Sequence, residues 1–110
     1  MIMVRIPTHG PPTQPGEMLL EEFLKPMGLS QVELAEKMGI SCPRLNELIH
    51  GKRGVTPDTA LHLEQLFGME AQFWLNLQLA RELYEITHSP SMKGIRKIKR
   101  LTPSKQFGAI

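Results

Sequence analysis

The sequence of 110 residues has a single cysteine, Cys42, and no long apolar run. One cysteine excludes a disulfide within the chain and favours a cytoplasmic setting. No stretch approaches the roughly 20 apolar residues needed to cross a bilayer, and the first residues lack the basic-then-apolar pattern of a signal peptide. We therefore expect a cytoplasmic protein without a membrane partner.

Catalytic and metal-binding motifs are also missing. The four histidines are dispersed and form no HExxH pair, and Cys42 has no second cysteine for a zinc site and no evident base beside it. The sequence contains no P-loop, no GxGxxG and no GxSxG. We expect no enzymatic activity, no cofactor and no bound metal.

The end of the chain has no acidic residue. Residues 1–87 contain seven lysines and arginines and all 11 acids, for a net charge of −4, whereas residues 88–110 contain six basic residues. This asymmetry has two interpretations. The residues after 87 form a basic tail that lies near a polyanion, or they form a solvated tail without a partner.

What the sequence does contain is helical periodicity, with no convincing alternation typical of strands. Four prolines make residues 1–15 an extended arm. Five helices are predicted, over residues 16–24, 31–38, 42–50, 57–67 and 70–87. The first is expected to stop at Leu24, because Pro26 disfavours a helical Lys25. The predicted fold is all-α, a five-helix lambda-repressor-like domain over residues 16–87.

The segment from residue 31 to residue 50 has the spacing of a helix-turn-helix. Ser30, with Glu33 three residues on, and Ser41 are N-caps for two short helices that are joined by a turn at Gly39. The inward positions are all apolar: Leu34, Ala35, Met38, Ile40, Leu45 and Leu48. This pattern predicts that the second helix enters the major groove of DNA. An ordinary helical hairpin is the alternative.

Nine residues on and around this pair are candidate DNA contacts. They are Gln31, Ser41, Cys42, Pro43, Arg44, Asn46, Glu47, Lys52 and Arg53. The three cations suit phosphates, and Gln31 stands at a helix N-terminus, which also attracts a phosphate. Asn46 can pair with adenine, and Glu47 can accept from cytosine. Glu47 has a second interpretation, in which it pairs with a neighbouring cation.

Residues 70–87 carry two apolar stripes. One stripe consists of Phe73, Leu77, Ala80 and Tyr84, and the other of Leu75, Leu79, Leu83 and Ile86. One stripe can cover the core of the domain, and the second is predicted to form a dimer seam with another copy of the chain. The alternative is one broad apolar face within a single core.

Several segments between Thr8 and Tyr84 resemble the HigA antitoxins, which are also called VapI. The segments are PGEMLLEEFL (15–24), LSQVELA (29–35), NELIHGKRGVTP (46–57), ALHL (60–63), FG (67–68) and FWLNLQ (73–78). These antitoxins are helix-turn-helix proteins of the phage-repressor-like class (XRE, or Cro/C1, type). Gln14 is a departure, because the family often has histidine there.

The resemblance implies a homodimer that represses its own operon by binding an inverted repeat of double-stranded DNA. It also implies a partner, a HigB-like toxin that cleaves mRNA on the ribosome. An enzyme that approaches RNA should present a basic face, so the acidic Glu17, Glu21 and Glu22 are candidate toxin contacts. Two other functions stay open: a regulator without a toxin, and an interaction module that no longer binds DNA.

Overall fold

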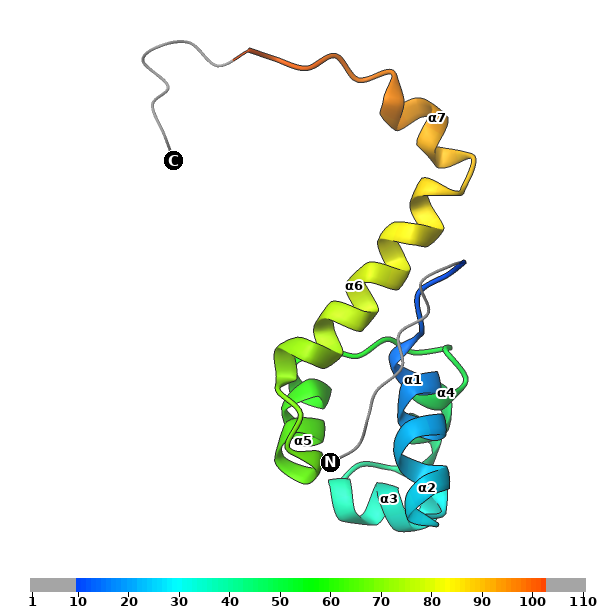
Figure 1. Ribbon diagram of the computed structural model, residues 1–110, viewed down its shortest axis with the longest axis vertical. Helices are drawn as coiled ribbons and strands as arrows, with labels where there is room; N and C mark the ends of the chain where they lie inside the picture. The colour runs from blue at the N-terminus through cyan, green and yellow to red at the C-terminus, as the bar shows by residue number, and fades with distance from the viewer. Residues whose placement is uncertain (1–9, 103–110) are drawn as a thin grey trace.

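The computed structural model describes residues 10–102, and these residues form helices without a strand (Figure 1). The elements are α1 (Pro15–Leu19), η1 (Leu20–Leu24), α2 (Lys25–Met27), α3 (Gln31–Met38), α4 (Cys42–Ile49), α5 (Pro57–Phe67), α6 (Ala71–Thr87) and α7 (Ser91–Arg96). The first three follow one another without a break, so the described part of the chain has six helices. The expected all-α fold is confirmed. Residues 1–9 of the predicted arm and residues 103–110 of the predicted tail, Lys105 among them, lie outside the described residues.

The predicted N-caps form as expected. The Ser30 hydroxyl accepts the Glu33 N–H at 3.0 Å, and the Glu33 carboxylate accepts the Ser30 N–H at 3.0 Å. This capping box begins α3, and Gly39 ends the helix with a φ of 76°. Hydrogen bonds from the Ser30 backbone and then its side chain lower the pKa of the Glu33 carboxyl. The cap therefore weakens as the pH falls through that lowered pKa.

The first helix runs further than expected. Pro26 does not end it, and Lys25 is helical, with φ −63° and ψ −51°. The reason is the π-helical turn of η1, in which the Lys25 N–H donates to the Leu20 carbonyl five residues back. A wider turn of this kind accommodates a proline ring, which in a regular α-helix would clash with the carbonyl four residues earlier.

The core lies between the first helix and helices α3 to α6. Its buried apolar residues are Met18, Leu19, Phe23, Leu24, Leu34, Ala35, Met38, Leu45, Leu48, Ile49, Val55, Ala60, Leu63, Trp74 and Leu77. The inward residues predicted for the helix-turn-helix are among them, except Ile40, which packs partly buried against them. Trp74 belongs to neither predicted stripe of residues 70–87, yet it is fully buried. Val32 of α3, although apolar, is 63% exposed.

Helix α6 rises out of the domain toward the far end of the molecule, and α7 follows it there (Figure 1). Residues 91–96 of the predicted tail are thus helical. None of the helices within residues 10–102 is long and apolar enough to span a bilayer.

Gly16 sets how closely the first helix approaches α4. A Cβ at this position would overlap the Leu48 carbonyl oxygen and would lie 2.8 Å from the Ile49 Cα. Both are backbone atoms, so neither can move aside by changing a rotamer. Helix packing at this crossing therefore requires glycine.

We expect Gly16→Ala to lower the free energy of unfolding by about 1–3 kcal/mol, the usual cost of overpacking a core. Gly94→Ala in α7 is the matched control, because a Cβ there meets no heavy atom within 4 Å. Chemical denaturation of both variants measures the difference. If the two variants have equal denaturation midpoints, the first helix can shift away from α4 without a loss of stability.

Candidate nucleic-acid interface

Helices α3 and α4 present a shared polar surface beside their buried contact. Leu34 and Ala35 of α3 and Leu45 of α4 are at most 2% exposed, which fixes how the two helices cross. On the outer side, the Asn46 amide donates to the Gln31 Oε1 at 3.1 Å. This bond joins the first residue of α3 to the middle of α4, so both side chains face the same region.

The first turn of α4 is open to solvent. Ser41 caps it by accepting the Arg44 N–H at 3.2 Å, and Cys42, Pro43 and Asn46 are exposed. Gln31 is half-buried. The structure thus brings these candidate contacts onto one accessible surface at the start of the second helix of the pair.

Glu47 pairs with a cation, as the second of its two interpretations expects. Its carboxylate accepts the Arg53 Nε at 3.0 Å and lies 2.9 Å from the Arg53 Nη2. Its backbone carbonyl also accepts the N–H of Lys52 at 2.8 Å. The turn after α4 is therefore tied to that helix, which leaves Lys52 exposed and without an ion pair among residues 10–102.

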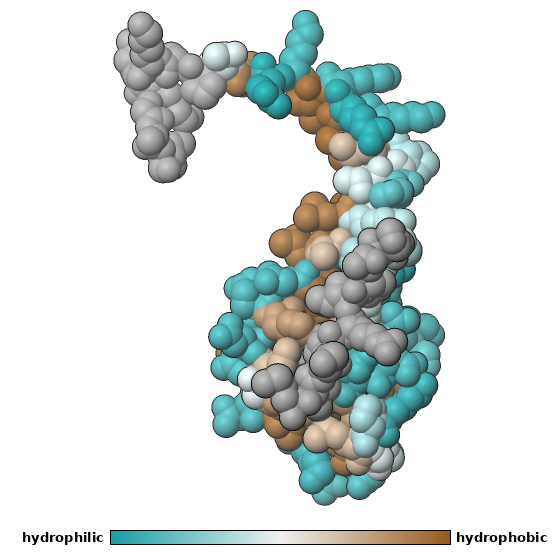
Figure 2. All heavy atoms as spheres, in the orientation of Figure 1, coloured by the Kyte–Doolittle hydropathy of each residue, from teal (hydrophilic) through white to brown (hydrophobic). Residues whose placement is uncertain are grey.

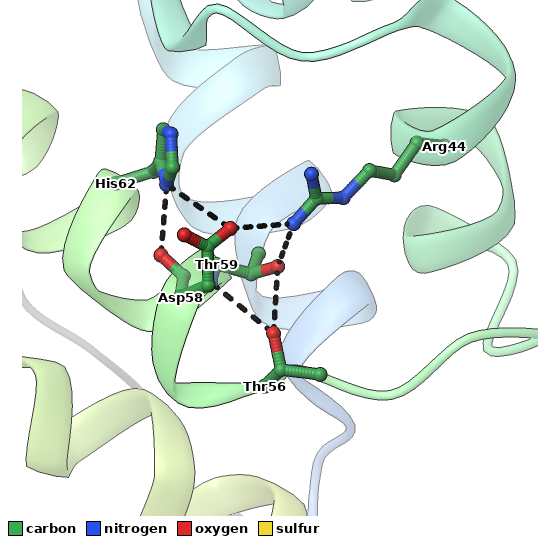
Figure 3. A network of polar contacts seen from close by, with 5 residues as sticks. All are labelled: Arg44, Thr56, Asp58, Thr59 and His62. Carbon is green, nitrogen blue, oxygen red and sulfur yellow. Dashed lines mark hydrogen bonds and ion pairs between the residues drawn. The ribbon is translucent and has the colours of Figure 1, made fainter.

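Arg44 links α4 to the start of α5 (Figure 3). Its Nη2 donates to the Asp58 carboxylate at 3.0 Å and to the Thr59 hydroxyl at 2.7 Å. Thr59 is 3% exposed, and its hydroxyl also lies 3.2 Å from that of Thr56, the N-cap of α5. His62 approaches the same carboxylate at 3.7 Å. Arg44 is therefore engaged within the protein, with 31% of its side chain exposed.

The partners of Arg44 were not expected from the sequence. Asp58 has an ordinary local role in the first turn of α5, where an acid suits the helix dipole. Nothing in the local pattern indicates that it meets a residue 14 positions earlier. Gln78 is a similar case. Its Oε1 accepts the Val55 N–H at 3.1 Å, and this bond ties the loop before α5 to α6.

The candidate dimer residues divide between the core and the surface. Leu75 packs partly buried against the core. Leu79, Leu83 and Ile86 are 54%, 55% and 48% exposed. The predicted second stripe therefore leaves three large apolar side chains on the outer half of α6.

The candidate toxin contacts lie on the first helix. Glu17 and Glu21 are exposed and Glu22 is half-buried. Glu21 already pairs with Lys25 at 2.9 Å. No group of three or more histidines, cysteines or acids in the part of the chain that the structure describes could hold a metal ion.

Comparisons with known proteins agree with this geometry. The helix-turn-helix family model matches residues 20–74. The chain is 52% identical over 73 residues to virulence-associated protein I of Dichelobacter nodosus, covering 66% of this chain and 68% of that protein. It is 43% identical over 75 residues to antitoxin HigA-1 of Vibrio cholerae, covering 67% of this chain and 70% of that protein. The solved structure of antitoxin GraA in complex with its operator has a TM-score of 0.77 and 34% identity, covering 90% of this chain and 100% of that one.

We expect Arg44→Ala to lower the free energy of unfolding by about 1–2 kcal/mol, because two hydrogen bonds from a charged group are lost. Lys52→Ala is the matched control, since this cation is exposed and has no ion partner among the described residues. Thermal unfolding of the two variants makes the comparison. If Arg44→Ala unfolds at the same temperature as the wild type, Asp58 and Thr59 do not hold α4 in place.

Proposed function

Because this chain belongs to the HigA (VapI) family of helix-turn-helix proteins, we propose that it represses its own operon and is the antitoxin of a toxin–antitoxin pair. Both roles are binding roles, so no catalytic step is involved. A repressor works where its DNA lies, which favours a cytoplasmic location. We divide the chain into an arm (1–15), a DNA-binding and dimerisation domain (16–87) and a basic tail (88–110).

The observation that carries the repressor role is the accessible polar surface of α3 and α4. Asn46 uses one amide N–H for Gln31, which leaves its second N–H and its carbonyl for a base edge. Lys52 lies in the turn that follows α4, exposed and with no ion pair among residues 10–102. The relative GraA, whose operator complex is solved, has the same arrangement of helices. The remaining DNA-contact assignments stay predictions.

A homodimer is the second part of the proposal. Two copies bind an inverted repeat whose half-sites are centred about 34–36 Å apart, one turn of the double helix. Three exposed leucine and isoleucine side chains on the outer half of α6 support a seam there: Leu79, Leu83 and Ile86. Covering them removes apolar surface that a monomer leaves in water.

The third part is a HigB-like toxin bound through the first helix. A ribosome-dependent endonuclease needs a basic face to approach RNA, and such a face is attracted to acidic side chains. Glu17 and Glu21 are exposed, and Glu17 has no ion partner in the described part of the chain. Occupation of this surface leaves the first turn of α4 free for DNA.

We expect Lys52→Ala with Arg53→Ala to weaken operator binding and to flatten its salt dependence. Each phosphate contact contributes about 0.9 to the slope of log K against log salt, so a dimer that loses four contacts loses about 3.6. Mobility-shift titrations with the gene's own upstream DNA at several salt concentrations measure the slope. The control is Lys25→Ala with Lys37→Ala, which removes the same charge from α2 and α3 and leaves the turn after α4 unchanged. An unchanged slope in the first variant would remove both residues from the phosphate contacts.

We expect Glu17→Lys with Glu21→Lys to slow association with the toxin about tenfold at low ionic strength, because electrostatic attraction acts mainly on the association rate. Operator affinity should survive in this variant. Stopped-flow or surface-plasmon measurements with the protein encoded beside this gene test the rate, with Glu70→Lys as a control on another surface. Unchanged association would move the toxin interface away from the first helix. Failure of any neighbouring protein to bind the wild-type chain would favour a regulator without a toxin.

A further inference from the structure

An apolar groove flanked by acids lies on the outer half of α6. Leu79, Leu83 and Ile86 line it together with Glu82 and Glu85, all from this one helix, so it is a shallow depression open to solvent. Glu85 is already held by Arg81 at 3.1 Å. Glu82 has no ion partner within residues 10–102. An occupant that suits this groove is apolar along one side and carries positive charge.

Residues 91–101, here called the basic segment, have this character. Their apolar residues recur at every third position: Met92, Ile95, Ile98 and Leu101. Their cations lie between these: Lys93, Arg96, Lys97, Lys99 and Arg100. Ile98 and Leu101 are 74% and 89% exposed, so the apolar side of the segment is also uncovered.

We propose that the basic segment of one copy packs into the α6 groove of a second copy. This inference rests on the proposed dimer and names the element that completes its seam. The apolar residues of the segment cover the three exposed side chains of the groove, and its cations approach Glu82. The segment is long enough, since its six helical residues span about 9 Å at 1.5 Å each and residues 97–101 extend it beyond the helix, whereas the groove from Leu79 to Ile86 spans about 10 Å.

The apolar side chains of both surfaces stay exposed within one chain: Leu79, Leu83 and Ile86 of the groove, and Ile95, Ile98 and Leu101 of the segment. Helix α7 begins after the break at Ser89 and Pro90 and continues beyond the end of α6 (Figure 1). Figure 2 shows apolar side chains on the outer part of α6 and again around α7, with paler and hydrophilic side chains between them. In a twofold dimer, a single exchange of segments covers both grooves at once.

DNA is a less suitable occupant for the basic segment. Helix α7 lies at the opposite end of the long axis from α3, which begins the proposed DNA-reading surface (Figure 1). A phosphate-binding arm also has no use for exposed side chains such as Ile98 and Leu101. The pairing of cations with apolar residues at every third position fits an acidic apolar groove better.

A charge-exchange experiment with the full chain tests the proposal. One variant reverses the groove with Glu82→Lys, and the other reverses the segment with Arg96→Glu and Arg100→Glu. Each alone should weaken self-association about tenfold at low salt. An equimolar mixture should restore it to within about twofold, because each reversed groove then meets a reversed segment, while the native groove meets the native segment. Sedimentation velocity over a range of concentrations measures each affinity.

Glu36→Lys and Lys37→Glu on α3 are the matched controls, and they should associate as the wild type does. Three results would overturn the exchange. In the first, both variants associate normally. In the second, a chain that carries Glu82→Lys together with Arg96→Glu and Arg100→Glu associates normally but the mixture of the two separate variants does not, which means that the segment folds onto its own α6. In the third, the segment variant loses operator affinity but keeps its self-association, which makes the segment a DNA arm.

The proposed dimer is tested separately by Leu79→Lys with Leu83→Lys, which should yield monomers. If that variant still dimerises, or if the wild type is monomeric, the α6 seam itself is wrong. If it is monomeric and the charge variants associate normally, the seam stands and only the exchange fails.

Discussion

Burial of Trp74 is the contact on which the rest of the structure depends. Helix α6 has 17 residues but buries only two of them, Trp74 completely and Leu77 to 5% exposure. The Trp74 ring lies 5.4 Å from that of Phe23 on the first helix, and Phe23 lies 4.6 Å from Phe67 at the end of α5. The indole N–H has no hydrogen-bond partner among the described residues, so apolar and aromatic packing, not a polar bond, anchors this helix.

Because α6 is anchored by its first turns, its two halves lie in different surroundings. The start of the helix completes the core that holds α3 and α4, whereas its outer half extends beyond the domain with Leu79, Leu83 and Ile86 exposed. In the proposed dimer, self-association takes place at the outer end of α6, away from the α3 and α4 surface that is proposed to read DNA. The contact proposed at that end would set the distance between the two reading surfaces of the dimer.

The polar contacts around α4 hold the helix from three sides. Arg44 joins it to α5, Asn46 joins it to α3, and Glu47 joins it to the turn that follows. Two of these pairs use a cation that the sequence pattern assigns to phosphates. Arg44 and Arg53 must therefore exchange an internal carboxylate for a phosphate if they contact DNA, whereas Lys52 gives up no ion pair within the described residues.

The sequence by itself determined helices α3 to α6, the N-caps of α3 and α4, and the inward face of the helix-turn-helix, whereas it missed α7. These features depend on residues within a few positions of one another, as the Ser30–Glu33 capping box does. Tertiary structure decided the rest. A π-helical turn, held in place by packing, carries the first helix past Pro26, and Trp74 is buried because the first helix and α5 meet it. Asp58 meets Arg44 across 14 positions because the fold brings α5 beside α4, and local pattern contains no information about a contact made at that separation.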